Sequence, residues 1–167
     1  MRATARELSA EARGLDVSEA VPFTQAEVDT LLPRVDLLVG RSLEFLAGVS
    51  ARFPPDAPLS PRVGRNFASQ LVVAVSEGHD VGAVANLVHA ELTKSHGKLV
   101  SALVASPERR LKECRRVIGA IESGLAAVEI AIRRAGERAR NEDDEVTARM
   151  PVGAAVGGRA SRGPAAR

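Results

Sequence analysis

Three histidines are the side chains of this sequence best suited to binding a metal ion or acting as a catalytic base: His79, His89 and His96. His89 and His96 are seven positions apart, which places them on one side of a helix but about 10.5 Å apart along its axis. That separation is too long for two imidazoles to share one ion directly. The Glu-x-x-His pattern of di-iron helical bundles is also missing. We therefore expect no bound metal, and imidazoles that border a buried stripe with one nitrogen in water.

The single cysteine, Cys114, excludes an intramolecular disulfide and a metal site built from several thiolates. It occupies an apolar position of a predicted helix, where a thiol normally fills the core instead of acting as a nucleophile. No Ser-His-Asp set, carboxylate pair or phosphate-binding glycine loop stands out. We therefore expect no cofactor and no enzymatic activity.

The most distinctive charges are cations at the start of the last predicted helix. Residues 107–140 hold nine Lys and Arg against five Glu. The N-terminal end of a helix disfavours each cation by about 0.3–1 kcal/mol at low salt, so another role is expected to favour them. They lie outside the apolar positions and form an outward patch suited to phosphates, an acidic protein surface, or the chain's own acidic residues 142–145. The patch consists of Arg109, Arg110, Lys112, Arg115 and Arg116.

The end of the chain has a different composition. Residues 150–167 are mainly Gly, Ala, Pro, Arg and Ser, a composition that buries too little apolar surface to offset the loss of chain entropy. We predict a disordered tail over residues 141–167, acidic at first and then basic. Its arginines Arg159, Arg162 and Arg167 join the predicted partner-binding set.

The elements that must position these side chains follow from apolar residues that recur at steps of three and four. Thr24 and Glu27 form a capping box, Asp80 is a helix N-cap, and Ser60-Pro61 is typical of a helix start. Pro33 interrupts the first pattern and predicts a kink. Helices are expected over residues 24–53, 61–77, 81–105 and 107–139.

The fourth helix carries the strongest pattern, an unbroken heptad seam. Its 33 residues would extend about 50 Å, beyond the roughly 37 Å diameter of a compact domain of about 140 residues. The predicted fold is an all-α, elongated antiparallel four-helix bundle, in which the surplus of the fourth helix could pair with a second copy as a homodimer. The seam consists of Leu111, Cys114, Ile118, Ile121, Leu125, Val128, Ile132, Ala135 and Ala139.

Domain organisation and compartment follow from composition. Four Phe with no Tyr or Trp argue against an all-β sandwich. One helical domain is expected over residues 21–140, preceded by a loosely attached, partly helical segment over residues 1–20 with a thin apolar face. The longest aliphatic run, residues 71–75, is far below the roughly 20 residues of a membrane span. With no signal-peptide pattern near the N-terminus, a cytoplasmic protein is expected.

Together these features predict a non-enzymatic protein-interaction protein, an adaptor or a structural or regulatory subunit, acting through the basic face of its last helix and its tail. One alternative is a nucleic-acid-associated accessory protein that contacts the phosphate backbone through its arginines, although no aromatic residues stand beside the cations for base stacking. A third is a small-ligand-binding helical regulator. Its pocket would be ringed by Asn66, Gln70, His89 or Glu91.

Overall fold

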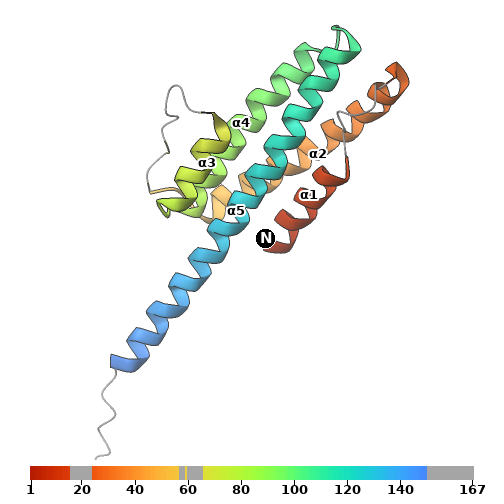
Figure 1. Ribbon diagram of the computed structural model, residues 1–167. Coiled ribbons are helices and arrows are strands. Elements are labelled where there is room, and N and C mark those ends of the chain that lie inside the picture. Colours follow the sequence, from red (N-terminus) through yellow and green to blue (C-terminus); the bar gives the residue numbers. More distant parts are fainter. Residues whose placement is uncertain (16–23, 57–58, 60–65, 150–167) are drawn as a thin grey trace, which may run out of the picture.

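The computed structural model describes residues 1–15, 24–56, 59 and 66–149, with the side chains of residues 143–149 left out. In this part of the chain every regular element is an α-helix, which confirms the all-α class. Figure 1 shows an elongated molecule in which the last helix runs along the others and projects beyond them. The helices are α1 (Arg2–Gly14), α2 (Gln25–Arg52), α3 (Phe67–Ser76), α4 (Val81–Ser101) and α5 (Pro107–Arg149).

Three helix starts, those of α2, α4 and α5, are those that the sequence predicts. The hydroxyl of Thr24 accepts a hydrogen bond from the backbone N–H of Glu27, whose carboxylate accepts from the backbone N–H of Thr24 at 2.7 Å. These hydrogen bonds hold the pKa of Glu27 below its ordinary value. Asp80 caps α4 by accepting from the backbone N–H of Ala83 at 2.6 Å. The helix that begins at Thr24 continues as α2 through Pro33, so the proline does not start a new helix.

Three helix boundaries differ from the prediction. α4 ends at Ser101 instead of residue 105, because backbone hydrogen bonds close a turn over the residues that follow it. Ser60-Pro61 lies outside the described residues. α3 begins at Phe67, and its N-cap is Asn66, whose side chain accepts from the backbone N–H of Ser69 at 2.8 Å. At the other end of the chain, α5 continues past Ala139 to Arg149. Residues 141–149, which the sequence assigns to the tail, are therefore helical in the structure. The apolar pattern stops there, but no Gly or Pro occurs between residues 140 and 149 to end the helix.

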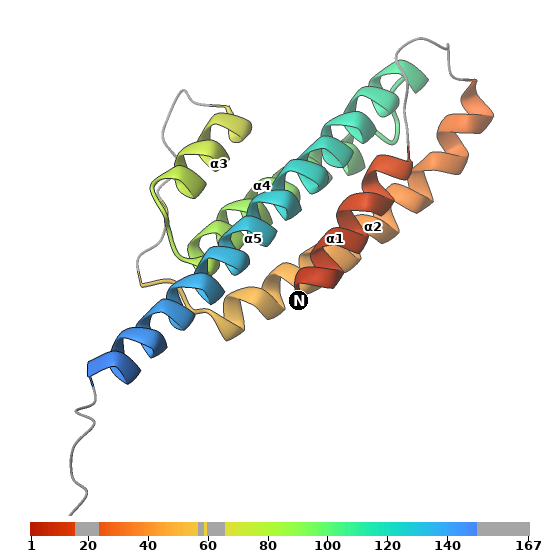
Figure 2. The same ribbon diagram turned by 60° about the horizontal axis from the view of Figure 1, so that its bottom comes forward.

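α5 lies at the centre of the packing. It contacts all four other helices, while α4 also packs on α2 and α2 on α1. Figure 2 shows α3 on one side of α4 and α5, and α1 and α2 on the other. Within the predicted seam, Ile118, Ile132 and Ala135 are only half-buried and Ala139 is exposed. Residues outside the seam are buried as well, because α5 has neighbours on several sides: Val117, Ala120, Ala127 and Ala131.

The N-terminal helix is packed more closely than the loose attachment expected from its sequence. Ala5, Leu8 and Ala12 of α1 are at most 2% exposed, and α1 rests mainly on α5. Ion pairs border this contact, since Arg6 lies 2.5 Å from Glu129 of α5. A narrow apolar face is enough here because the buried Ala5 and Ala12 have short side chains that allow a close approach of the two helices.

Replacing Leu8 by alanine tests this docking. We expect the free energy of unfolding to fall by about 2 kcal/mol, because the substitution leaves a cavity between α1 and α5. Urea unfolding followed by circular dichroism measures the change. Thr4→Ala, at an exposed position of the same helix, is the control and should change it by less than about 0.5 kcal/mol. If Leu8→Ala also lowered the free energy of unfolding by less than about 0.5 kcal/mol, α1 would be only loosely held.

No described helix combines the length and the apolar character that crossing a membrane requires.

Candidate functional site

The five predicted cations of α5 do not form one outward patch. Arg110 turns inward and is 13% exposed at its side chain. Its guanidinium donates to the carboxylate of Asp29 at 2.8 Å and to the side-chain oxygen of Gln25 at 2.7 Å, both in the first turns of α2. Arg116 lies 3.9 Å from Glu91 of α4, and Arg115 is half-buried. Arg110 therefore joins α5 to α2 and is withdrawn from any external partner.

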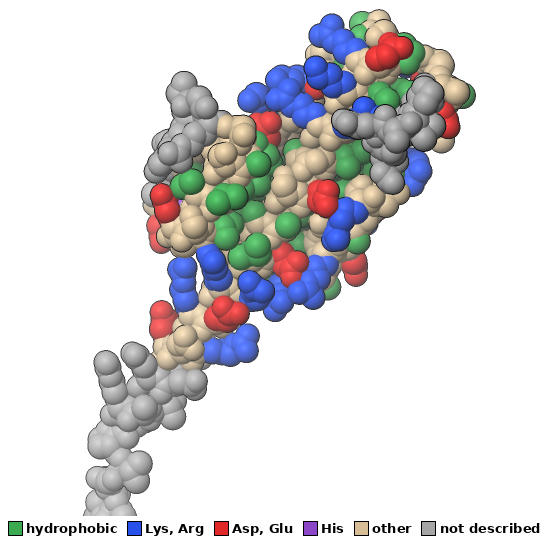
Figure 3. Space-filling model, in the orientation of Figure 1, with side chains coloured by type: hydrophobic (Ala, Val, Ile, Leu, Met, Phe, Trp, Pro, Cys, Tyr) green, Lys and Arg blue, Asp and Glu red, His purple; other side chains and the backbone are tan. Residues whose placement is uncertain are grey.

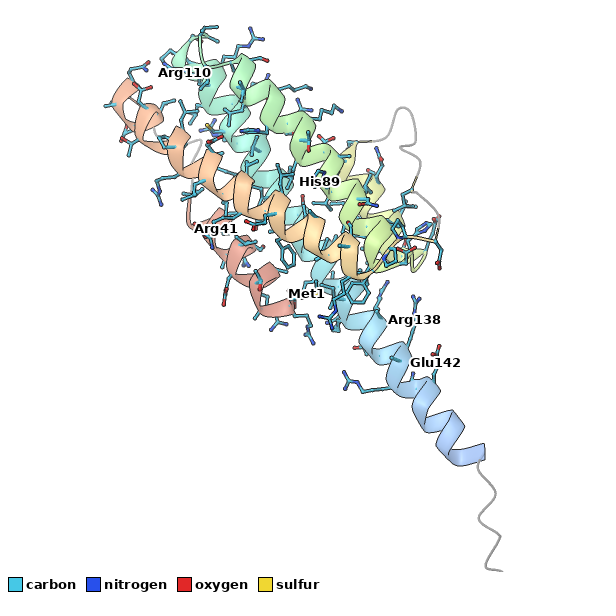
Figure 4. All side chains as sticks on the ribbon, turned by 180° about the vertical axis from the view of Figure 1, so that it is seen from behind. Met1, Arg41, His89, Arg110, Arg138 and Glu142 are labelled. Atoms are coloured by element: carbon cyan, nitrogen blue, oxygen red, sulfur yellow. The ribbon has the colours of Figure 1, made fainter. Side chains whose placement is uncertain are left out.

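Arg109 and Lys112 are the two patch residues that stay fully available. Both are exposed, and within the described residues neither side chain forms an ion pair with an acid. The chain's own acidic segment is out of reach of Arg109 and Lys112. Even Arg116, the patch residue nearest to it in sequence, lies 26 positions before Glu142, which is about 39 Å along α5. Figure 4 shows Arg110 and Glu142 toward opposite ends of this helix. The tail arginines Arg159, Arg162 and Arg167 lie outside the described residues.

Exposed aliphatic side chains stand beside these cations. Val100, Leu103 and Val104 are 51%, 49% and 97% exposed, half of the six large hydrophobic residues that the described chain exposes. They occupy the end of α4 and the turn into α5. Backbone hydrogen bonds hold this turn, including one from the N–H of Ala105 to the carbonyl of Ala102 at 2.9 Å. The side chains are thus presented by an ordered turn.

We call this end of the molecule the α4–α5 tip and define it by Val100, Leu103, Val104, Arg109 and Lys112. Figure 3 shows Lys and Arg side chains gathered toward this end of the molecule. Sequence reasoning found the two cations but missed the aliphatic residues. A signal was present, since Leu103 and Val104 follow Ala102, the last residue of the buried stripe, and precede the new start at Ser106-Pro107.

The histidines and the cysteine have structural surroundings. His96 Nε2 lies 2.7 Å from Asp36 of α2, His79 Nε2 lies 3.1 Å from Glu77, and His89 is half-buried in α4. In the part of the chain that the structure describes, no three His, Cys, Asp or Glu side chains converge as a metal site requires. Cys114 is completely buried.

Burial makes the Cys114 thiol unreactive. Desolvation raises its pKa to about 11, and the positive charge of Arg110 acts in the opposite direction. The thiolate fraction at pH 8 is therefore about 100-fold lower than for a thiol of pKa 9.0. We expect iodoacetamide at pH 8 to alkylate the native chain at least 100-fold more slowly than the urea-unfolded chain, as followed by mass spectrometry. Comparable rates for the two states would show that Cys114 is an accessible nucleophile.

The residues proposed to ring a pocket lie on α3 and α4 or cap them. Asn66 caps α3, and Glu91 lies on α4 within ion-pair distance of Lys94 and Arg116. A cleft of about 430 Å³ opens instead where the end of α2, the α3–α4 turn and α5 meet. Asn66, Gln70, His89 and Glu91 do not line this cleft.

The chain matches no known protein family, and no curated protein or solved structure shows a significant similarity to it. The geometry that bears on function is therefore the chain's own. At the α4–α5 tip, exposed aliphatic side chains lie close in sequence to exposed cations. This arrangement can bury apolar surface against a partner and form ion pairs with the partner's carboxylates.

Proposed function

We propose that this chain is a non-enzymatic helical interaction protein, an adaptor or a structural or regulatory subunit, that docks an acidic partner protein on its α4–α5 tip. The observation that carries the proposal is the exposure of Val104, at 97%, next to the half-exposed Leu103. Single exposed hydrophobic residues need no explanation. Here three of them cluster at the end of α4 and on the hydrogen-bonded turn that follows it, as the apolar centre of an interface does.

The cations beside the turn indicate the charge of the partner. Arg109 and Lys112 are exposed, and Lys98 is exposed in the last turn of α4. Charges at the rim of an interface mainly steer association and select the partner, while buried anchors supply affinity. A partner that offers an apolar pocket with carboxylates at its edge therefore fits the tip. The tail arginines would add further charge of the same sign.

Nucleic acid fits the tip less well than protein does. A phosphate backbone would contact Arg109 and Lys112 but would leave Leu103 and Val104 in water. Sequence-reading elements insert a helix or a ribbon into a groove, whereas this surface is a turn with aliphatic side chains. Nucleic acid is therefore an alternative outcome of the experiment below.

The helix contacts support a bundle as the scaffold for this surface. α1 packs on α5, α5 on α4, α4 on α2 and α2 on α1, which closes a ring of four helices with α3 outside it on α4 and α5. We infer an antiparallel four-helix bundle in which α1 takes the place that the sequence analysis assigns to the helix over residues 61–77. The heptad pattern of α5 would then serve packing within the chain.

The projecting part of α5 is a weaker candidate for self-association. Among the described side chains of residues 137–142, the only residue of the predicted seam is Ala139, and its neighbours Glu137, Arg138 and Arg140 are charged and exposed. A coiled coil with a second copy needs an apolar stripe. We therefore place the docking surface at the tip and make a homodimer an outcome to be measured by sedimentation.

Co-purification from the chain's own host tests the proposal. The tagged chain is compared with Val104→Asp/Arg109→Glu, with the matched control Leu37→Asp/Arg34→Glu at an exposed site of α2, and with a chain that ends at Arg149. We expect a partner that the unaltered chain and the control recover but the tip variant does not, and that then binds as a purified protein. Recovery of the same partners by the tip variant would overturn the proposal.

Two purified probes separate the other anionic partners. We expect no binding of duplex DNA at 50 mM salt and none of vesicles containing anionic phospholipid. DNA binding with a log-log salt slope of several units, weakened by Arg109→Glu but not by Val104→Asp, would replace the proposal with a nucleic-acid function. Vesicle binding that both substitutions weaken would replace it with docking on a membrane surface.

A further inference from the structure

A second surface feature lies away from the tip, between α3 and α5. A groove of about 410 Å³ runs between these helices and is lined mainly by apolar side chains, with Leu71 and Val72 on α3 facing Ala126, Ala127 and Ile130 on α5. Val72 is 67% exposed at its edge. Figure 3 shows hydrophobic side chains gathered between α3 and α5 on this face, with Lys and Arg side chains just beyond the end of α3.

The shape of the groove follows from small residues on α5. Ser123, Ala126 and Ala127 present short side chains toward α3, so a hollow remains where larger side chains would fill the contact. Its volume lies in the range of small-molecule sites. Ser123 and Arg134, both of which line the groove, are eleven positions apart, which makes it about 16 Å long. An open apolar groove of this length suits an aliphatic chain.

Arginine stands at the end of this groove. Arg134 lines both the groove and the cleft where α2, the α3–α4 turn and α5 meet, so the two hollows adjoin at its side chain. One turn later on α5, Arg138 also lines the cleft and donates to the carbonyl of Gly78 at 3.1 Å. Arg52 reaches the cleft from the last turn of α2.

The three arginines keep donors available for a ligand. Arg134 donates to the carbonyl of Val75, but a guanidinium has five N–H donors. Within the described residues, Arg52, Arg134 and Arg138 form no ion pair with a carboxylate. Two acids also line the cleft. Asp80 is engaged as the cap of α4, and Glu142 is exposed, so the arginines outnumber the acids.

We propose that the groove and the cleft together bind an amphipathic aliphatic anion of the fatty-acid class. The aliphatic chain lies along the groove between α3 and α5. The carboxylate lies at Arg134, within the positive charge of Arg138 and Arg52. This site is separate from the α4–α5 tip and independent of the function proposed for it.

Isothermal titration calorimetry with three probes tests the site. Dodecanoate, below its micelle concentration, combines the two features that the site recognises. Dodecanol lacks the charge, and butyrate lacks the long chain. We expect both to bind at least tenfold more weakly than dodecanoate. Equal binding of dodecanol would overturn the role of the arginines, equal binding of butyrate would overturn the role of the groove, and no binding of dodecanoate would overturn the whole proposal.

Substitutions locate the binding on the structure. Ala126→Phe fills the groove from an exposed position, and Arg138→Gln removes a charge from the cleft. Each should weaken dodecanoate binding at least tenfold, whereas Arg133→Gln, at an exposed position that lines neither hollow, should leave it unchanged. Circular dichroism with and without dodecanoate verifies that each variant stays folded. Unchanged affinity in folded Ala126→Phe would show that the ligand lies elsewhere.

Discussion

Replacing Gly82 by alanine is expected to lower the free energy of unfolding by about 3 kcal/mol or more. Gly82 is buried in the first turn of α4, where a Cβ atom would overlap the carbonyl oxygen of Phe53 and would lie 3.0 Å from the backbone nitrogen of Pro55. Both contacts are backbone atoms, which cannot rotate away. The end of α2 would have to move off α4, and the packing between these helices would open.

Gly97 in the same helix provides the control. It is exposed, and within the described residues no side chain and no neighbouring element lies within 4 Å of the Cβ that an alanine would add. Gly97→Ala should raise stability by about 0.5–1 kcal/mol, because alanine loses less backbone entropy in a helix. Urea unfolding followed by circular dichroism measures both variants. If Gly82→Ala proved as stable as Gly97→Ala, the close approach of α2 and α4 at Gly82 would be disproved.

The helices could be predicted where local chemistry decides their ends. Thr24 with Glu27, and Asp80, satisfy the first backbone N–H groups of α2 and α4 with side chains a few positions away, so a short stretch of sequence carries the information. The N-cap of α3 is Asn66. The sequence offers Ser60-Pro61 as a second helix-start signal nearby, and local sequence alone does not decide between the two. The end of α5 could not be predicted, because loss of the apolar pattern indicates exposure and does not by itself end a helix.

Burial could be predicted only along one face of each helix. The seam of α5 identified Leu111, Ile121 and Leu125, which are buried. It did not identify Ala127 or Ala131, because whether an alanine is buried depends on which helices cover it. The close packing of α1 could not be predicted for the same reason. Its narrow apolar face is buried because α5 offers it a surface in addition to those that contact the other helices.

The candidate site could be predicted by residue type but not by role. The sequence marked Arg109 and Arg110 as equal members of one basic patch. The two arginines differ because Arg110 pairs with Gln25 and Asp29. These two residues lie 85 and 81 positions before it in the sequence and meet it only after α2 packs against α5. Exposure of Val104 depends in the same way on what the fold leaves uncovered.

Charge reversal at these two neighbouring positions should have opposite consequences. Arg110→Glu places a carboxylate against Asp29 in a place where the arginine side chain is 13% exposed. Removing one member of a buried ion pair costs about 3–5 kcal/mol. Since Asp29 is 51% exposed, water relieves part of the repulsion, and we expect a loss of about 2–3 kcal/mol in urea unfolding. Arg109→Glu should cost nothing and gain up to about 0.5 kcal/mol, because an acid suits the first turn of a helix.

A charge swap distinguishes the ion pair from a general effect of the substitution. Asp29→Lys combined with Arg110→Glu restores opposite charges between α2 and α5 and should recover at least about 1 kcal/mol of the loss. The swap leaves Arg109, Lys112 and Val104 in place, so the rescued chain should still dock its partner, whereas the stable Arg109→Glu chain should dock it more weakly. If the swap recovered no stability, Arg110 would not join the helices through its charge. If Arg109→Glu docked as well as the unaltered chain, the rim of the tip would not select an acidic partner.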